Sequence, residues 1–151
     1  MRRLQIGIRE VKCAPGVVVV EPVNIYECTI GENTFIGPFT EIQRGVVIGK
    51  NCKIQSHSFL CELVTIGDDC FIGHGVMFTN DRFSEGGPAG GRKELWCETR
   101  VGNHVSIGSG ATLLPVEICD NVVIGAGTVV TKSITRPGVY AGNPARFLRE
   151  H

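Results

Sequence analysis

The sequence lacks long apolar runs and net charge, and each absence excludes a class of protein. No apolar run approaches the roughly 20 residues that span a membrane. Charges interrupt the basic start, MRRLQIGIREVK, too early for a signal peptide. The formal net charge is zero, which argues against a general nucleic-acid or membrane-surface binder. We therefore expect a soluble, cytoplasmic protein whose 151 residues form a single domain.

The sequence also lacks paired cysteine motifs. It has seven cysteines, an odd number, and none of them forms a C-x-x-C pair. This pattern predicts reduced thiols that serve as small apolar fillers rather than disulfides or zinc ligands.

What the sequence has is a repeat of six residues. Nine consecutive positions six apart carry large apolar side chains: Ile30, Ile36, Ile42, Ile48, Ile54, Leu60, Ile66, Ile72 and Phe78. A helix cannot use this period, because successive positions would rotate around its surface. Short strands separated by turns can, and a glycine often follows the apolar position, where we expect it to supply unusual turn dihedrals.

This pattern resembles the hexapeptide repeat of left-handed β-helix proteins. The resemblance implies an all-β, left-handed parallel β-helix in which three hexads form a coil of about 18 residues. Ile30, Ile48 and Ile66 would then stack on one face, and Cys52 and Cys70 would be interior neighbours. The rhythm resumes at Val101 and continues to Val130, which gives about five coils, with Met1 to Cys13 as a cap over the first.

Between the two runs of repeats, the rhythm stops in the stretch FTNDRFSEGGPAGGRK. We expect residues 81–98 to form a loop extruded from a corner of the solenoid, because this stretch is too rich in glycine for another strand. Loops on rigid scaffolds commonly carry function. A tolerated surface insertion is the alternative.

The C-terminal run VVIGAGTVVTKSITRPGVYAGNPARFLRE resembles the signature of hexapeptide acyltransferases that use an acyl-coenzyme A. The resemblance implies acetyl-CoA as acyl donor, bound in the groove between two subunits of a homotrimer. The cofactor-binding residues that it implies are Ser109, Ala126, Thr131, Lys132, Arg146 and Arg149. Small residues let a ligand approach the backbone, and cationic groups suit phosphate. The alternative is that these residues are only turns and solvated charges.

The acyl acceptor is indicated by the residues around the loop. O-acetyltransferases of this fold use a loop histidine as general base, but here Asp81 follows Asn80 and the loop contains no histidine. The segments EPVNIYECTIG, GPFTEIQRGVVIGKNCKIQSHSFLC and FIGHGVMFTNDRF instead resemble a branch that N-acetylates nucleotide-linked amino sugars. Its best-known member acts on a UDP-linked amino uronic acid in surface-polysaccharide synthesis, and dTDP-amino-sugar enzymes are relatives.

Within this resemblance, we expect the Asn80 side-chain carbonyl to hold the acceptor amine against the thioester. Asp81 and Arg82 would shape the sugar pocket, with Arg82 able to meet a carboxylate or a diphosphate. The alternative for Asn80 is a turn-forming residue that opens the loop.

The histidines leave a second reaction open. His57 and His74 should point outward at the same corner, where either could contact substrate or act as base. O-acetylation of a sugar or small alcohol is therefore the alternative reaction, and a non-catalytic β-helix assembly subunit is the alternative outside enzymes. The β-helix carbonic anhydrases bind zinc with three histidines, two of them five residues apart. No pair of histidines here has that spacing, so we expect no metal.

Overall fold

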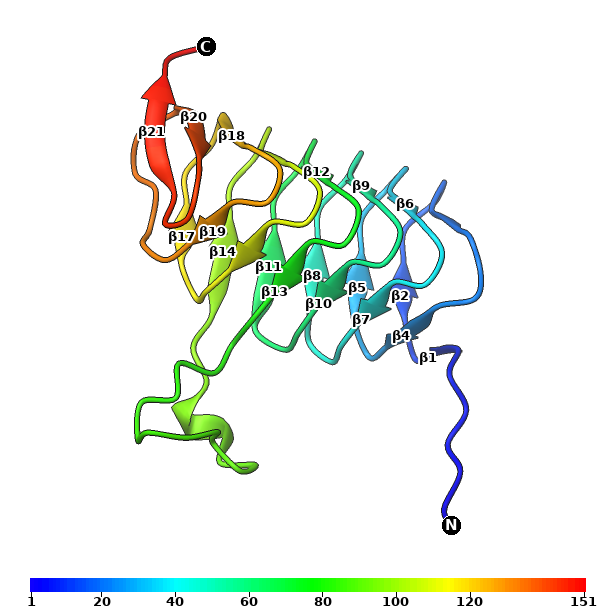
Figure 1. The fold of residues 1–151 in the computed structure, drawn as a ribbon. Helices are drawn as coiled ribbons and strands as arrows, with labels where there is room; N and C mark the ends of the chain where they lie inside the picture. Colours follow the sequence, from blue (N-terminus) through cyan, green and yellow to red (C-terminus); the bar gives the residue numbers. More distant parts are fainter.

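A computed structural model describes all 151 residues as a parallel β-helix, a solenoid with three flat sheets joined at corners (Figure 1). The first sheet has seven parallel strands: β1 (Ile8–Arg9), β4 (Asn24–Tyr26), β7 (Glu41–Ile42), β10 (Phe59–Leu60), β13 (Met77–Phe78), β16 (Thr112–Leu113) and β19 (Val129–Val130). The all-β parallel β-helix predicted from the repeat is confirmed.

The second sheet has six strands: β2 (Lys12–Cys13), β5 (Thr29–Ile30), β8 (Val47–Ile48), β11 (Val64–Ile66), β14 (Thr99–Val101) and β17 (Glu117–Ile118). The third has eight: β3 (Val18–Val19), β6 (Phe35–Ile36), β9 (Lys53–Ile54), β12 (Phe71–Ile72), β15 (Ser106–Ile107), β18 (Val122–Ile124), β20 (Gly138–Ala141) and β21 (Arg146–Arg149). The first strands of the three sheets form one coil, and the next three strands form the coil above it.

The predicted apolar positions form the core. All nine of the repeated apolar positions from Ile30 to Phe78 are at most 1% exposed, because the side chain at this position of each short strand points into the solenoid. Ile30 pairs with Ile48, and Ile48 pairs with Ile66, as the stacking of 18-residue coils requires.

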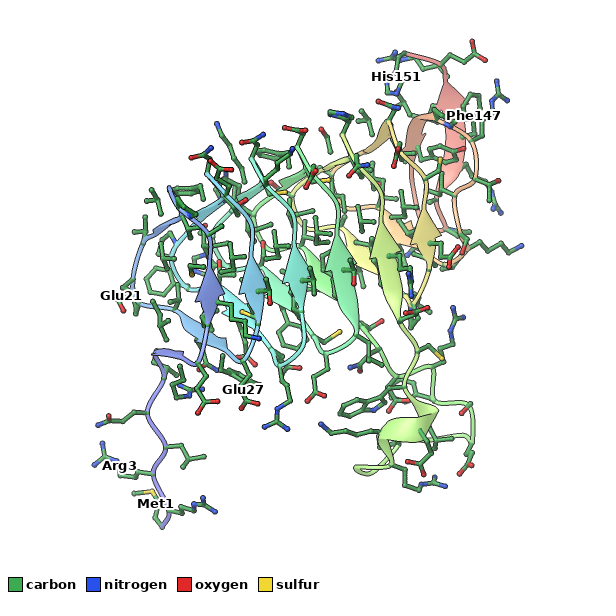
Figure 2. The ribbon with its side chains drawn as sticks, turned by 180° about the vertical axis from the view of Figure 1, so that it is seen from behind. Met1, Arg3, Glu21, Glu27, Phe147 and His151 are labelled. Carbon is green, nitrogen blue, oxygen red and sulfur yellow. The ribbon has the colours of Figure 1, made fainter.

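The predicted number of coils is too low, because the first sheet runs through seven turns of the solenoid. The missed turns lie at the two ends. Ile8–Arg9, Lys12–Cys13 and Val18–Val19 form the first coil, so the prediction that Met1 to Cys13 caps the solenoid is wrong. Met1 and Arg3 instead lie clear of the coils (Figure 2). The last turn ends in an antiparallel pair, β20 and β21.

The glycines that follow the apolar positions have a different role from the predicted one. Gly31, Gly49 and Gly67 do not have a positive φ; a Cβ on any of them would lie 2.5–2.6 Å from backbone atoms of the next coil. Glycine is therefore required for close stacking at these positions. The left-handed turn conformation is taken two residues later, by residues such as Asn33 and Asn51.

All seven cysteines are free thiols, as predicted. Cys52 and Cys70 are buried in the interior, where each donates an Sγ–H hydrogen bond at 3.1 Å to a carbonyl of the adjacent coil, Gly67 O and Gly102 O respectively. These thiols therefore fill the core and also satisfy backbone acceptors.

The extruded loop is present where the sequence predicts it. It leaves after β13 and returns at β14, contains the short 3-10 helix η1 (Lys93–Leu95), and projects from the solenoid (Figure 1). An isolated antiparallel bridge between Asp81 and Trp96 closes its base. Val101 re-enters in register with Ile66, on the sheet where the next strand was due.

Candidate active site

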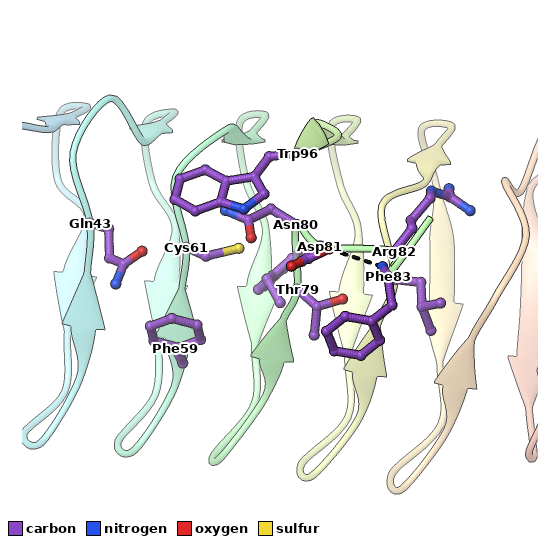
Figure 3. A pocket seen from close by; sticks show the side chains of 11 residues that line it. Gln43, Phe59, Cys61, Thr79, Asn80, Asp81, Arg82, Phe83 and Trp96 are labelled. Carbon is purple, nitrogen blue, oxygen red and sulfur yellow. Dashed lines mark hydrogen bonds between the residues drawn. The ribbon is translucent and has the colours of Figure 1, made fainter. Parts of the chain in front are cut away.

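A pocket of about 600 Å³ lies at the base of the loop, at the corner between the first and second sheets. Its lining comes from coils that are far apart in sequence (Figure 3). The lining residues are Gln43, Phe59, Cys61, Phe78, Thr79, Asn80, Asp81, Arg82, Phe83, Trp96 and Leu114. The three predicted loop-entry residues, Asn80, Asp81 and Arg82, are therefore all in it.

Asn80 is held in one orientation. Its Nδ2 donates to the backbone carbonyl of Glu62 at 3.1 Å, and its own backbone carbonyl accepts from Cys97 N at 2.8 Å. Because the amide nitrogen is the atom that donates to Glu62, the Oδ1 atom is left as an acceptor on a pocket residue. A fixed neutral acceptor of this kind can accept a hydrogen bond from an amine.

Asp81 organises the loop. Its Oδ1 accepts from Phe83 N at 2.9 Å (Figure 3). Its Oδ2 accepts from Ala89 N at 2.7 Å, so the carboxylate ties together two parts of the loop. Asp81 thus fixes the conformation of the loop beside the pocket.

The Arg82 side chain lines the pocket, but its guanidinium group points away from the pocket centre. Its Nη2 donates to the carbonyl of Pro115, and its guanidinium extends away from Asn80 (Figure 3). Its position therefore does not favour the expected contact with a carboxylate beside Asn80.

The loop is fastened to the solenoid by charged and aromatic contacts. Lys93 Nζ lies 2.8 Å from Glu62 Oε2 and 5.3 Å from the centre of the Trp96 ring. The indole of Trp96 lies beside Asn80 at the pocket (Figure 3). Glu62 thus contacts the loop twice, through its carbonyl to Asn80 and through its carboxylate to Lys93.

His57 and His74 lie at a different corner, between the third and first sheets, and both are exposed as expected. His74 Nδ1 is 2.9 Å from Ser56 Oγ. The ring of His57 packs against Phe39, with 4.9 Å between ring centroids. Of the two, only His74 has a side-chain hydrogen bond, made through Nδ1.

The six predicted cofactor residues fall into separate groups. Ser109 and Ala126 are exposed at the corner of His74, on successive coils: Gly110 N donates to His74 O at 2.8 Å and Gly127 N to Ser109 O at 2.9 Å. Thr131 and Lys132 follow β19 at the corner of the pocket, and Arg146 and Arg149 lie exposed on β21.

One chain therefore carries Ser109 and Ala126 at one end of the first-sheet strands, and the Asn80 pocket, together with Thr131 and Lys132, at the other end. Ser109 precedes β16 and Leu114, a pocket residue, follows it. The strands of the first sheet therefore separate the corner of Ser109 and Ala126 from the pocket of Asn80.

Sequence reasoning missed several pocket residues, notably Gln43, Phe59, Cys61 and Trp96. Gln43 and Cys61 occupy the same position in successive coils as Thr79, because Ile42, Leu60 and Phe78 stack immediately before them. The period of 18 residues could therefore have identified Gln43 and Cys61 once the pocket was assigned to Thr79. Burial raises the pKa of the Cys61 thiol to about 12, so it remains a neutral thiol.

Comparisons with known proteins agree with the fold and the repeat. The family described as bacterial transferase hexapeptide (six repeats) matches residues 27–61. The hexapeptide repeat of succinyl-transferase matches residues 63–77 and 98–132. Together these matches cover more than half of the chain, which is thus a repeat protein of the parallel β-helix class. It belongs to the hexapeptide-repeat transferase family.

Sequence relatives include enzymes of more than one kind. The chain is 34% identical over 128 residues to the galactoside O-acetyltransferase of Escherichia coli K12. The aligned region covers 81% of this chain and 63% of that protein. It is 28% identical over 142 residues to the bifunctional protein GlmU of Streptococcus uberis, which covers 88% of this chain and 31% of that protein. The chain spans less than two thirds of the length of these relatives.

Solved structures share the fold at lower identity. A variant of AntD, an N-acyltransferase from Bacillus cereus in complex with dTDP and coenzyme A, superposes with a TM-score of 0.82 at 23% identity, covering 93% of this chain and 83% of AntD. PerB from Caulobacter crescentus, in complex with CoA and GDP-perosamine, gives a TM-score of 0.66 at 20% identity, covering 92% and 58%. No helix of the structure has the length and hydropathy needed to cross a membrane.

Proposed function

We propose that the protein is an acyltransferase that moves the acetyl group of acetyl-CoA to the amine of a nucleotide-linked amino sugar, UDP- or dTDP-linked, in cytoplasmic steps of surface-polysaccharide synthesis. The observation that carries this proposal is the fixed Asn80 amide, whose Oδ1 is left as an acceptor in a pocket lined by no histidine. The CoA and nucleotide in the AntD and PerB structures support it.

The chemistry needs little from the protein beyond positioning. A sugar amine that titrates like an α-amino group, near 7.7–8.0, is partly neutral at pH 7. Its nitrogen attacks the thioester carbonyl, the C–S bond breaks, and the departing CoA thiolate takes up the proton that the nitrogen loses. Asn80 Oδ1 would accept an N–H of the amine and aim the nitrogen lone pair at the carbonyl.

The donor would lie along the column of Ser109 and Ala126, whose small exposed side chains leave room beside the backbone. Thr131 and Lys132 would meet the lower part of the cofactor, with Arg146 and Arg149 near its phosphates. Ser109 and Ala126 lie at one end of the first-sheet strands and the Asn80 pocket lies at the other end. We therefore infer that Ser109 and Ala126 of one subunit face the loop of the next subunit in a homotrimer.

The test is acetyl transfer followed as free-thiol release, with a panel of UDP- and dTDP-linked amino sugars. Transfer to one amino sugar, with the amide as product, is the expected result. Coenzyme A binding is titrated in parallel. A chain that binds no coenzyme A would instead be a non-catalytic assembly subunit.

O-acetylation of a sugar or small alcohol is the second candidate, favoured by the Ser56–His74 hydrogen bond and by the galactoside O-acetyltransferase relative. An alcohol needs a base, which His74 Nε2 could provide, with His57 as the second choice. This candidate would be established if no amino sugar is acetylated, coenzyme A still binds and an alcohol is acetylated.

A further inference from the structure

The corner that joins the third sheet to the first carries a stack of residues in the left-handed turn conformation, which we call the turn column. Its members have φ values between 61° and 71°: Phe39, His57, Gly75, Gly110 and Gly127. They occupy the same position in successive coils, because the N–H of each donates to a corner carbonyl of the preceding coil, as Gly110 N does to His74 O at 2.8 Å. One turn position can thus be compared over five coils.

The side chains at this position divide the turn column into an open and a closed part. A Cβ on Gly75, Gly110 or Gly127 would meet no atom within 4 Å, so open space lies beside the backbone in these three coils. The two earlier coils carry Phe39 and His57, whose rings pack with 4.9 Å between centroids. The open part therefore ends at the ring of His57.

Phe39 has a conformation that is unusual for its residue type. A bulky side chain rarely adopts a φ near 60°, whereas glycine adopts it readily. Phe39 is also 58% exposed, so burial in the core does not compensate for this strain. Strained residues of this kind gather at ligand sites, which points to a role for the ring outside the core.

The orientation proposed for acetyl-CoA brings its acyl group to these two rings. The arginines of β21 lie in the last turn, Ala126 and Ser109 in the two preceding coils, and His74 in the coil before them. With the phosphates at the arginines and the pantetheine arm beside Ala126 and Ser109, the thioester reaches the coil of His74. The acyl group then points toward His57, one strand spacing of about 4.8 Å further along.

We propose that Phe39 and His57 limit the length of the acyl chain that the protein accepts, because their rings close the turn column one coil beyond His74. The proposal rests on the proposed function, from which it takes the direction of the donor and the neighbouring loop that covers this corner. It goes beyond that function by assigning donor specificity to two residues, one of which, Phe39, has no part in the proposed reaction.

A second space lies on the other side of Phe39, toward the first coil. It is a cavity of about 250 Å³, and Ile6, Pro22 and Val23 form its apolar wall together with Phe39. Removal of both rings would join this cavity to the open part of the turn column. A chain longer than the one that His57 alone excludes would then have an apolar space to enter.

The experiment measures the dissociation constants of acetyl-CoA, butyryl-CoA and hexanoyl-CoA by titration calorimetry, so that no acceptor sugar is needed. The wild type should bind butyryl-CoA about 30-fold more weakly than acetyl-CoA, because two further methylenes meet a filled site. His57→Gly should reduce this difference to about threefold, because the first ring is removed. The double variant Phe39→Gly/His57→Gly should also bind hexanoyl-CoA within about tenfold of acetyl-CoA, because the chain reaches the cavity.

His104→Gly is the matched control. His104 has the same turn conformation, with a φ of 55°, and is exposed at the corner between the second and third sheets, away from the turn column. We expect its ratio of butyryl-CoA to acetyl-CoA affinity to equal that of the wild type. Because glycine suits a positive φ, the thermal midpoints of all variants should stay within about 4 °C of the wild type.

Two results would overturn the acyl-length proposal and leave the proposed function standing. One is a wild type that binds acetyl-CoA and butyryl-CoA with affinities within about threefold of each other. The other is a folded His57→Gly variant that keeps the wild-type ratio. A double variant that still excludes hexanoyl-CoA would remove Phe39 from the proposal. A wild type that binds none of the three thioesters would overturn the proposed function and the acyl-length proposal with it, so the two failures are distinguishable.

Discussion

Asn80→Ala should separate a catalytic loss from a structural one. The substitution removes one neutral hydrogen bond, to Glu62 O at 3.1 Å, which costs about 1 kcal/mol of stability. A domain with only about 5 kcal/mol of stability would still be more than 99% folded after that loss. Global unfolding therefore cannot account for a large fall in activity.

We expect kcat for amine acetylation to fall about 100-fold, the effect of misplacing a reacting group by about 1 Å. The KM for acetyl-CoA should change little, because Asn80 Oδ1 contacts the acceptor amine in the proposed reaction and Asn80 is not among the residues proposed to hold the cofactor. The assay is thiol release at saturating amino sugar, with thermal unfolding of the same samples. The midpoint should fall by about 2–4 °C per kcal/mol lost.

Asn51→Ala is the matched control. Asn51 Nδ2 donates to Asp69 Oδ1 at 3.0 Å on a corner away from the pocket, and Asn51 has a φ of 55°, which disfavours alanine. Its stability cost should equal or exceed that of Asn80→Ala, with kcat unchanged. If Asn80→Ala retains more than half of the wild-type kcat, Asn80 is only a turn residue and the positioning role is refuted.

Three further predictions concern the scaffold. The Thr128 hydroxyl is buried without a hydrogen-bond partner, so Thr128→Val should raise the free energy of unfolding, measured in urea, by about 1 kcal/mol. Thr40→Val removes a 2.8 Å hydrogen bond to the Gly37 carbonyl and should lower the free energy of unfolding by about as much. Burial raises the pKa of the Cys61 thiol from 9.0 to about 12. The stability that this thiol contributes is therefore fully present below pH 9 and is lost as the pH rises toward 12. Cys61→Ala should reduce the slope of the unfolding free energy against pH by up to about 1.4 kcal/mol per pH unit. Gly67→Ala would place a Cβ 2.6 Å from the next coil and should cost about 1–3 kcal/mol or more, while Gly87→Ala, with nothing within 4 Å, should be nearly neutral on thermal unfolding.

The candidate site could be predicted only in part. The loop entry from Asn80 to Arg82 was identified by the break in the repeat, and these residues do line one pocket. Their partners could not be read from the sequence: Asn80 bonds to Glu62 and Arg82 to Pro115, which are 18 and 33 positions away. The expected role of Arg82 toward a carboxylate therefore receives no support from its position.

The sequence by itself determined the period of six and the position of the loop, because that period is a local pattern repeated along the chain. The resemblance to the hexapeptide repeat supplied the 18-residue coil of the β-helix. That is why Val101 and Ile118 could be assigned to their sheet. The irregular first coil, in which Cys13 and Val19 pair in register with Ile30 and Ile36, and the final pair β20 and β21 do not carry the pattern. Only the tertiary structure decided how the loop is fastened, which glycines stacking requires, and which residues line the pocket. These features depend on contacts between coils, and side chains there pair through space rather than along the sequence.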